Sequence, residues 1–264
     1  MHFTKMHGLG NDYLYVYGEV PGNIAELSRK LSDRHFGAGS DGMIYISPSK
    51  VADFRMRIFN ADGSEAKMCG NGIRCVGKYV YDKGYTDETR LTVETLSGIK
   101  KLDLRVQSGK VRSVTVDMGP AQIGEDLELE INGETIKGAK VSVGNPHFVV
   151  FVDDIEKAPL YTLGPVIEKH DAFPGGVNVE FVQVTGEDSL RMRVWERGSG
   201  VTMACGTGAC ASTSAAVSKG YCRSGSPVSV ALDGGTLEIT AGEGRNVMMT
   251  GPAEWIYEGD TAYD

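Results

Sequence analysis

The sequence predicts an α+β protein built from two similar halves, with a largely antiparallel sheet. Two observations support this prediction. Segments repeat along the chain at a constant spacing, and strand-like alternating segments outnumber helical ones. The length of 264 residues is long for one hydrophobic core and comfortable for two domains of about 100–150 residues.

The repeated segments share one register. Arg-Met-Arg-Ile-Phe at 55–59 is followed 136 residues later by Arg-Met-Arg-Val-Trp at 191–195. Cys-Gly-Asn-Gly at 69–72 matches Cys-Gly-Thr-Gly at 205–208, and Lys-Gly-Tyr at 83–85 recurs at 219–221, both at the same spacing. Gly-Asn at 10–11 recurs at 144–145, with a spacing of 134. We infer a duplicated domain with a pseudo-twofold relation: an N-terminal half at 1–116 and a C-terminal half at 117–264, whose tail at 253–264 can belong to either half.

Each half has the same predicted plan. A strand at 55–59 or 191–195 leads through a Gly- and Ser-containing loop into the Cys-Gly-x-Gly segment. A helix of small and apolar residues follows, at about 72–81 or 208–219, and ends near a Lys-Gly pair. Further alternating segments predict strands at 91–95, 100–106, 111–117, 228–232 and 236–240. Because the two helices are rich in apolar residues, we expect them to be buried, with each sheet wrapping around its helix.

Composition and charge exclude several classes of function. The net charge is −8 and no Lys/Arg stripe is present, so we expect no nucleic-acid partner. The longest apolar run, 148–152, is far shorter than the roughly 20 residues of a membrane span. The first residues lack a signal-peptide pattern, and we therefore expect a cytoplasmic protein. The five cysteines, an odd number, argue against a disulfide framework.

Cys69 and Cys205 lie where a loop meets a helix. The first N–H groups of a helix lack internal partners and its dipole makes this end positive. We therefore expect a lowered thiol pKa and room for a carboxylate at each junction. The neighbouring glycines allow a ligand to approach the backbone.

The pseudo-twofold relation is expected to bring both junctions to the interface of the halves. A carboxylate held there would have one sulfur on each side. This suits removal of a proton from one face of an α-carbon by a thiolate and its return to the other face by a thiol. No pyridoxal phosphate signature, P-loop or Rossmann fingerprint is present, so we expect no cofactor.

Several motifs together resemble the diaminopimelate epimerase family over almost the whole chain. They are Met-His-Gly-Leu-Gly-Asn-Asp at 6–12, Asn-Ala-Asp-Gly-Ser at 60–64, Cys-Gly-Asn-Gly-Ile-Arg-Cys at 69–75, Gly-Asn-Pro-His-Phe at 144–148, Val-Asn-Val-Glu-Phe at 177–181, Glu-Arg-Gly at 196–198 and Ala-Cys-Gly-Thr-Gly at 204–208. The resemblance implies two similar domains, each a barrel-like sheet around a central helix. It also implies interconversion of L,L- and meso-diaminopimelate, on the route to lysine and peptidoglycan precursors, with diaminopimelate as the small-molecule partner.

The resemblance assigns roles residue by residue. Cys69 and Cys205 match the acid/base pair, with Cys205 as base and Cys69 as acid from the L,L to the meso form. His147 and Glu196 match residues that support catalysis. The matching substrate-binding positions are Asn11, Asn60, Asn145, Asn178, Glu196 and Arg197, and those of the backbone cradle for the reacting carboxylate are Gly70, Asn71, Gly206 and Thr207. The Arg197 guanidinium is suited to the distal carboxylate. At Gly42, some family members carry a substrate-binding Gln.

Alternative interpretations stay open at this point. Cys75, Cys210 and Cys222 are expected to be buried thiols without a catalytic role. A zinc site formed by Cys69, Cys75, Cys205 and Cys210 is disfavoured. The two cysteines of each pair are 6 and 5 residues apart, which exceeds the spacing of common zinc-ligand pairs. We therefore expect no metal. A racemase of proline, hydroxyproline or histidine with two cysteines, or a thiol redox protein, competes with the epimerase hypothesis. The sequence leaves the oligomeric state open, including a homodimer.

Overall fold

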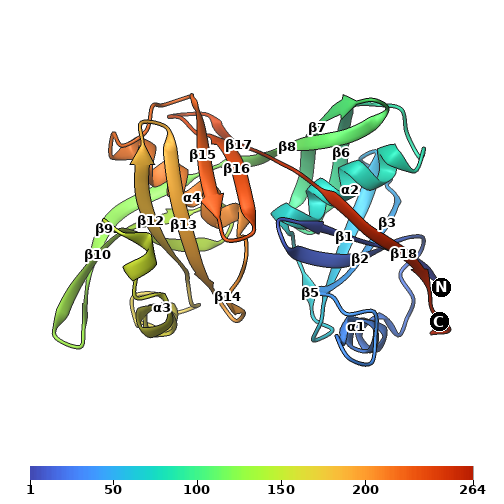
Figure 1. Ribbon diagram of the computed structural model, residues 1–264, viewed down its shortest axis with the longest axis horizontal. Helices are drawn as coiled ribbons and strands as arrows, with labels where there is room; N and C mark the ends of the chain where they lie inside the picture. Colours follow the sequence, from blue (N-terminus) through green and yellow to red (C-terminus); the bar gives the residue numbers. More distant parts are fainter. Residues whose placement is uncertain (264) are drawn as a thin grey trace. The chain divides into compact units, whose positions relative to one another are not determined.

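The computed structural model describes residues 1–263, which form a mixed α/β fold made mostly of strands (Figure 1). This part of the chain has four α-helices and one short 3₁₀ helix, η1. The helices are α1 (Ile24–Ser32), α2 (Gly70–Asp82), α3 (Leu160–Glu168) and α4 (Gly206–Ser218), and η1 spans Ile155–Lys157. None of them has the length and apolar character needed to cross a bilayer.

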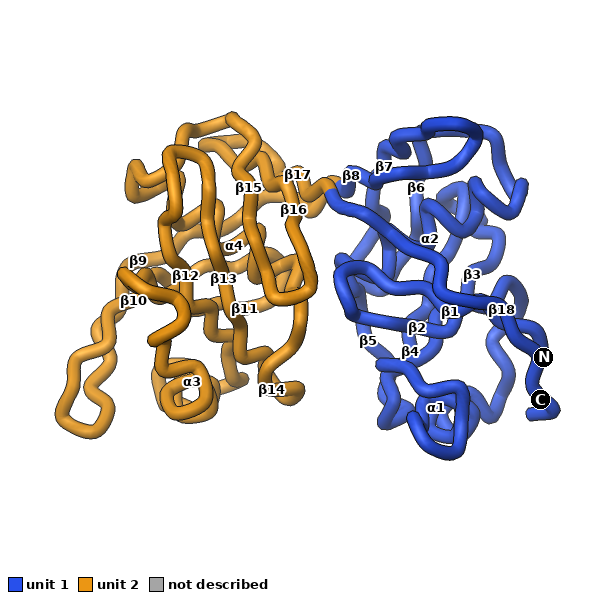
Figure 2. The backbone as a smooth tube through the Cα atoms, in the orientation of Figure 1, with its two compact units in different colours: residues 1–116, 251–264 blue, residues 117–250 orange. Residues whose placement is uncertain are grey.

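Contacts between Cα atoms divide the chain into two compact units, one formed by 1–116 with 251–264 and one formed by 117–250 (Figure 2). The strands of the first unit are β1 (His2–Gly8), β2 (Asn11–Tyr17), β3 (Gly42–Pro48), β4 (Phe54–Asn60), β5 (Glu65–Ala66), β6 (Arg90–Thr95), β7 (Gly98–Gln107), most of β8 (Lys110–Pro120) and β18 (Glu254–Asp260). Those of the second are β9 (Gln122–Ile131), β10 (Glu134–Ser142), β11 (Pro146–Phe151), β12 (Asn178–Gly186), β13 (Ser189–Glu196), β14 (Gly200–Val201), β15 (Pro227–Leu232), β16 (Gly235–Thr240) and β17 (Asn246–Gly251).

Strand pairing in the first unit is mostly antiparallel. The parallel pairs are β2 with β3 and β4 with β6, whereas β18 pairs antiparallel with β1. Helix α2 contacts β1, β2 and β7, and its residues from 70 to 80 are all buried. Close packing explains the glycine within this helix, since a Cβ at Gly77 would lie 2.9 Å from a methyl group of Leu104.

The second unit has the corresponding pairing. Its parallel pairs are β11 with β12 and β13 with β15. Helix α4 contacts β10 to β13, β15 and β16, and it is built almost entirely from small residues. These small side chains let strands approach the helix from several sides, which is why α4 lacks the polar face of a surface helix. Helix α3 packs on β12 and β13.

The structure confirms the two predicted helices and shifts their ends. Helices α2 and α4 each begin two residues earlier than predicted, directly after Cys69 and Cys205. The predicted strands at 55–59, 91–95, 191–195, 228–232 and 236–240 are confirmed within one or two residues as β4, β6, β13, β15 and β16. Helices α1 and α3 and the hairpin of β9 and β10 were not predicted from the sequence.

Candidate active-site residues in each unit

Cys69 is the N-cap of α2 in the first unit. Its backbone is extended, and its sulfur accepts a hydrogen bond from the N–H of Gly72 at 3.3 Å. The thiol in turn donates to Oδ1 of Asn11 at 3.3 Å. Gly72 packs closely against β3, since a Cβ there would lie 2.7 Å from Cδ1 of Ile44. The start of α2 therefore holds the thiol between a backbone donor and an amide acceptor.

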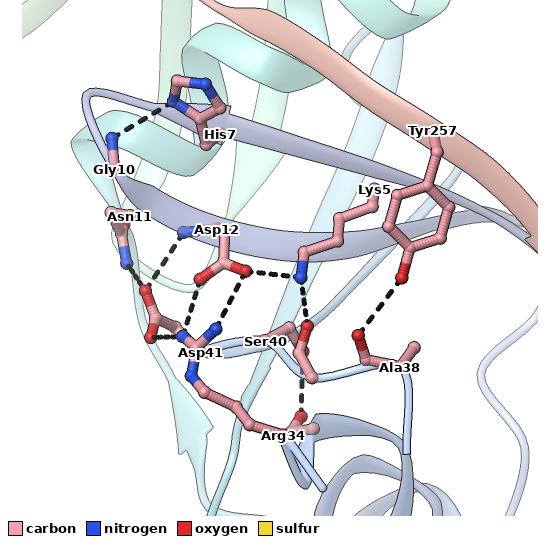
Figure 3. A network of polar contacts seen from close by, with 12 residues as sticks. Lys5, His7, Gly10, Asn11, Asp12, Arg34, Ala38, Ser40, Asp41 and Tyr257 are labelled. Carbon is pink, nitrogen blue, oxygen red and sulfur yellow. Dashed lines mark hydrogen bonds and ion pairs between the residues drawn. The ribbon is translucent and has the colours of Figure 1, made fainter.

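A polar network fixes the orientation of the Asn11 amide (Figure 3). Nδ2 of Asn11 donates to Asp41 at 2.7 Å, so the amide oxygen is left for Cys69. Asp41 also accepts from the N–H of Asp12 at 3.0 Å and from Arg34 at 3.0 Å. The hydrogen bond to Asp41 thus turns the oxygen of the Asn11 amide, and not its nitrogen, toward the thiol.

Asp12 anchors the other end of this network. Its carboxylate pairs with Lys5 at 2.9 Å and with Arg34 at 2.8 Å. Burial by itself raises the pKa of Asp12, but hydrogen bonds from Arg34 and Lys5 outweigh burial and hold the pKa below its ordinary value. A buried carboxylate is stable here because two cations neutralise it.

The remaining predicted positions of the first unit lie around the same helix start or on β4. Gly70 and Asn71 form the first turn of α2, and Oδ1 of Asn71 accepts from Arg74 at 3.0 Å. Asn60 ends β4 and donates to the hydroxyl of Ser64 at 3.1 Å. Cys69, Gly70, Asn71 and Asn11 thus lie together at the start of α2, whereas the Asn60 side chain bonds to Ser64 in the turn that follows β4.

Gly42 is required by the backbone. A Cβ at this position would lie 2.2 Å from the carbonyl oxygen of Phe59, in the adjacent strand β4. Its φ of +153° also disfavours other residues. A side chain such as Gln does not fit this position unless the two strands move apart.

Cys205 is the N-cap of α4 in the second unit. Its sulfur accepts from the N–H of Gly208 at 3.3 Å and lies 3.6 Å from the hydroxyl oxygen of Thr207. Gly206 and Thr207 form the first turn of the helix. Burial, followed by the charges of Glu196 and Glu180, raises the pKa of Cys205 well above its ordinary value, although the hydrogen bonds to Thr207 and Gly208 lower it. The expectation of a lowered pKa at this helix start is wrong for Cys205, because burial and two carboxyl groups outweigh the helix terminus.

Behind Cys205 lies a buried chain of polar side chains. Nδ1 of His147 lies 2.7 Å from Oε1 of Glu180, and both side chains are fully buried. Nε2 of His147 lies 3.1 Å from Oδ1 of Asn145, and Nδ2 of Asn145 donates to Thr207 at 3.3 Å. The structure thus connects His147 and Asn145 to the start of α4. Glu180 was not among the predicted site residues, although a single acidic residue within an apolar strand was a signal for it.

Glu196, Arg197 and Asn178 lie together at the ends of β12 and β13. Glu196 accepts a hydrogen bond from Thr202, and burial raises its pKa. Oδ1 of Asn178 accepts from the N–H of Arg197 at 2.9 Å. The Arg197 side chain is exposed, and its guanidinium donates to the carbonyl of Gly175 at 2.9 Å. An exposed guanidinium held by one backbone carbonyl retains donors for a ligand.

No group of three or more ligand side chains within residues 1–263 is arranged to hold a metal ion. Cys75, Cys210 and Cys222 are buried and unbonded to one another. Burial raises the pKa of Cys75 to about 11. These features are consistent with a packing role for the three thiols.

The comparisons with known proteins agree with the sequence resemblance. A family model described as diaminopimelate epimerase matches residues 3–124 and 139–256. Diaminopimelate epimerase from Bacillus licheniformis is 51% identical over an alignment of 276 positions, covering 98% of this chain and 97% of the relative.

Two solved structures share the fold at low identity. A phenazine biosynthesis protein of the PhzF family from Bacillus anthracis has a TM-score of 0.77 at 17% identity, covering 99% of this chain and 98% of the other. A probable proline racemase from Agrobacterium radiobacter has a TM-score of 0.75 at 20% identity, covering 100% and 93%. These two show similarity of fold alone, whereas the family model and the close relative extend along the chain. The chain belongs to the diaminopimelate epimerase family.

Proposed function

We propose that the chain carries out the diaminopimelate epimerase reaction of lysine biosynthesis by proton transfer between Cys69 and Cys205. Family membership carries the reaction to this chain. The observation that supports the mechanism is the repeated helix start: each cysteine is the N-cap of a buried 13-residue helix and accepts a hydrogen bond from the glycine N–H three residues on. A reaction at one α-carbon with a base on one face and an acid on the other needs two such groups.

The proton transfer balances within the two thiols and the substrate. From the L,L to the meso form, the Cys205 thiolate takes the α-proton, and the electron pair of the broken C–H bond passes into the substrate carboxylate. The Cys69 thiol then gives its proton to the opposite face of the α-carbon. Cys205 ends as the thiol and Cys69 as the thiolate, which is the state required for the reverse reaction. The proposal requires both sulfurs to reach opposite faces of one α-carbon.

The helix starts supply the stabilisation of negative charge. As the α-proton leaves, charge develops on the substrate carboxylate. Backbone N–H groups of Gly70 and Asn71 in one unit, and of Gly206 and Thr207 in the other, belong to first helical turns, which the helix itself leaves without acceptors. We assign these groups to the reacting carboxylate. Asn11 and Asn145, each beside its helix start, are assigned to the same end of the substrate.

The surroundings of Cys205 favour its thiol form. Burial, followed by the charge of Glu196, raises the pKa of this sulfur. The α-ammonium group of the substrate offers a counter-charge to Glu196, which would weaken the effect of that carboxylate on Cys205. Substrate binding would thereby help the sulfur to lose its proton when it must act as base.

The distal end of the substrate carries a second amino-acid head group. We assign its carboxylate to Arg197, whose exposed guanidinium can bind two oxygens at once. Asn178, which holds the backbone of Arg197, and Asn60 are assigned to the same end. A one-headed amino acid leaves this guanidinium without a partner, so the assignment accounts for selection of diaminopimelate over proline or histidine.

For the architecture, we propose two halves with a pseudo-twofold relation, each a mostly antiparallel, barrel-like sheet around α2 or α4. The matched positions of the two parallel strand pairs and of the two helices support this proposal. A homodimer is a separate proposal, which sedimentation of the purified protein would test.

The experiment that tests the function is incubation of the reduced protein with L,L-diaminopimelate in deuterated water, followed by proton NMR and chiral chromatography. We expect deuterium at an α-position together with the meso form, and no exchange on L-proline or L-histidine. Exchange on one of the controls but not on diaminopimelate would keep the two-thiol mechanism and reject the substrate. No exchange on any of the three would reject the mechanism.

A further inference from the structure

The two cysteines have different neighbours at equivalent positions of the repeat. In the 136-residue register, Glu180 corresponds to Ile44. The structure shows the same contact in both units: a Cβ at Gly72 would lie 2.7 Å from Cδ1 of Ile44, and a Cβ at Gly208 would lie 2.7 Å from Oε1 of Glu180. The carboxyl group thus occupies the place that an aliphatic side chain fills beside the other cysteine.

Two further positions near the cysteines also differ between the two units. Glu196 corresponds to Asn60 in the same register, and His147 corresponds to Tyr13 in the register of the Gly-Asn pairs. Cys205 therefore has two carboxyl groups and an imidazole nearby, whereas the equivalent places around Cys69 hold uncharged side chains. Duplication produced two similar helix starts, and these substitutions made their electrostatics unequal.

Two contacts hold the ring of His147 in place. Nε2 of His147 lies 3.1 Å from Oδ1 of Asn145, whose Nδ2 donates to Thr207. Nδ1 of His147 lies 2.7 Å from Oε1 of Glu180. Asn145 and Glu180 therefore contact opposite nitrogens of the same ring.

Glu180 has no second source of neutralisation in the described part of the chain. Its Oε2 is buried and has no hydrogen-bond partner within residues 1–263. A buried carboxylate without a counter-charge is unstable. A turn of the His147 ring would therefore leave the Glu180 carboxyl group without its hydrogen bond.

We propose that Glu180 is a positioning residue for the epimerisation. Its carboxyl group fixes the orientation of the His147 ring, and through His147 and Asn145 it orients the Thr207 hydroxyl beside Cys205. The inference rests on the proposed function for its catalytic consequence, but its effect on the thiol is independent of the substrate.

The groups that set the charge around Cys205 come from three strands. They are His147 on β11, Glu180 on β12 and Glu196 on β13. The charge of Glu180 acts to raise the pKa of Cys205. Removing that charge while keeping the shape of the side chain should make Cys205 lose its proton at lower pH and should leave Cys69, in the other unit, unchanged.

The test compares Glu180→Gln with wild type and with Glu238→Gln, the same chemical change at an exposed position on β16. The rate of iodoacetamide labelling of each cysteine is followed against pH by peptide mass spectrometry, so Cys69 serves as an internal reference. We expect the labelling midpoint of Cys205 to move to lower pH in Glu180→Gln only. We also expect kcat to fall roughly 10²-fold with little change in KM, and Glu180→Asp to recover part of the loss.

The outcomes separate this inference from the proposed function. An unchanged Cys205 profile and unchanged kcat in folded Glu180→Gln would overturn the inference, while conversion of diaminopimelate by wild type would still support the function. A shifted profile in a protein that does not convert diaminopimelate would retain the effect of Glu180 on the thiol and reject the function.

A measurement on wild type covers the case in which Glu180→Gln does not fold. ¹⁵N-resolved NMR of histidine side chains should show one ring, assigned to His147, whose N–H exchanges slowly with water because the ring is buried and hydrogen-bonded. Fast exchange, as in an exposed histidine, would overturn the inference.

Discussion

Gly208→Ala tests how tightly the second unit is built around Cys205. The added Cβ would lie 2.7 Å from Oε1 of Glu180 and 3.2 Å from the cysteine sulfur. An ordinary carbon–oxygen contact is roughly 3.3 Å, so the carboxyl group must move by roughly 0.6 Å. It already lies 2.7 Å from His147 in a fully buried site, and such a shift would break that hydrogen bond.

The expected loss of stability follows from three contributions. Overpacking costs about 1–3 kcal/mol, and weakening a hydrogen bond to a charged group costs about 1.5–3 kcal/mol. Replacing a helical glycine by alanine returns up to about 1 kcal/mol. We expect Gly208→Ala to lower the free energy of unfolding by roughly 2–4 kcal/mol.

Gly72→Ala is the matched control in the first unit. Its Cβ would meet only the terminal methyl groups of Ile44 and Met56, at 2.7 and 3.1 Å, and these can move without breaking a hydrogen bond. We therefore expect a loss of no more than about 2 kcal/mol. Urea denaturation followed by circular dichroism measures both variants. Equal destabilisation, or a larger loss in the control, would refute the claim that the Glu180 carboxyl is locked.

Three further predictions concern catalysis, specificity and acid stability. Replacing either helix-start cysteine by alanine should reduce epimerisation at least about 10³-fold while retaining diaminopimelate binding, as measured by chiral chromatography and calorimetry; near-full activity in one variant would contradict the two-thiol scheme. Arg197→Ala should raise KM for diaminopimelate about 10- to 100-fold, the value of a charged hydrogen bond, and an unchanged KM would remove Arg197 from the distal site. The pKa of Asp12 is lowered by Arg34 and Lys5, so its stabilisation is present above about pH 4 and is lost as the pH falls through the folded-state pKa. Urea midpoints of Asp12→Asn and wild type should therefore differ at pH 7 and converge in acid, and a constant difference would contradict this assignment.

The sequence predicted those elements whose signals are local. Helices α2 and α4 follow from runs of small and apolar residues after a glycine-rich junction, and the repeat identified them twice. Helices α1 and α3 lie outside the repeated motifs, so the repeat gave no signal for them. The hairpin of β9 and β10 carries many exposed charged residues, so it lacks the alternation that marks a half-buried strand.

The candidate site shows the same limit. The motifs named Cys205 and His147, but the pKa of the thiol depends on burial and on carboxyl groups from β12 and β13, which only the folded chain brings beside it. Glu180 lies within the Val-Asn-Val-Glu-Phe motif at 177–181, but its place beside His147 depends on how the strands pair. The parallel register of β11 and β12, which pairs His147 with Asn178, places Glu180 two residues further along the same strand face. No local pattern in the sequence gives that register.

The path of the chain between the units has a consequence for how the protein folds. Gly-Pro-Ala occurs at 119–121 and again at 251–253, at the two points where the chain passes from one unit to the other. The strand after the first tripeptide, β9, pairs with β10 of the second unit, and the strand after the second, β18, pairs with β1 of the first. The C-terminal half of the sequence thus gives its last strand, β18, to the first unit, much as a strand is exchanged between subunits in domain swapping. A fragment that stops at residue 250 leaves an edge of β1 unpaired, so the first unit is completed only by a strand that follows the whole second unit in the sequence.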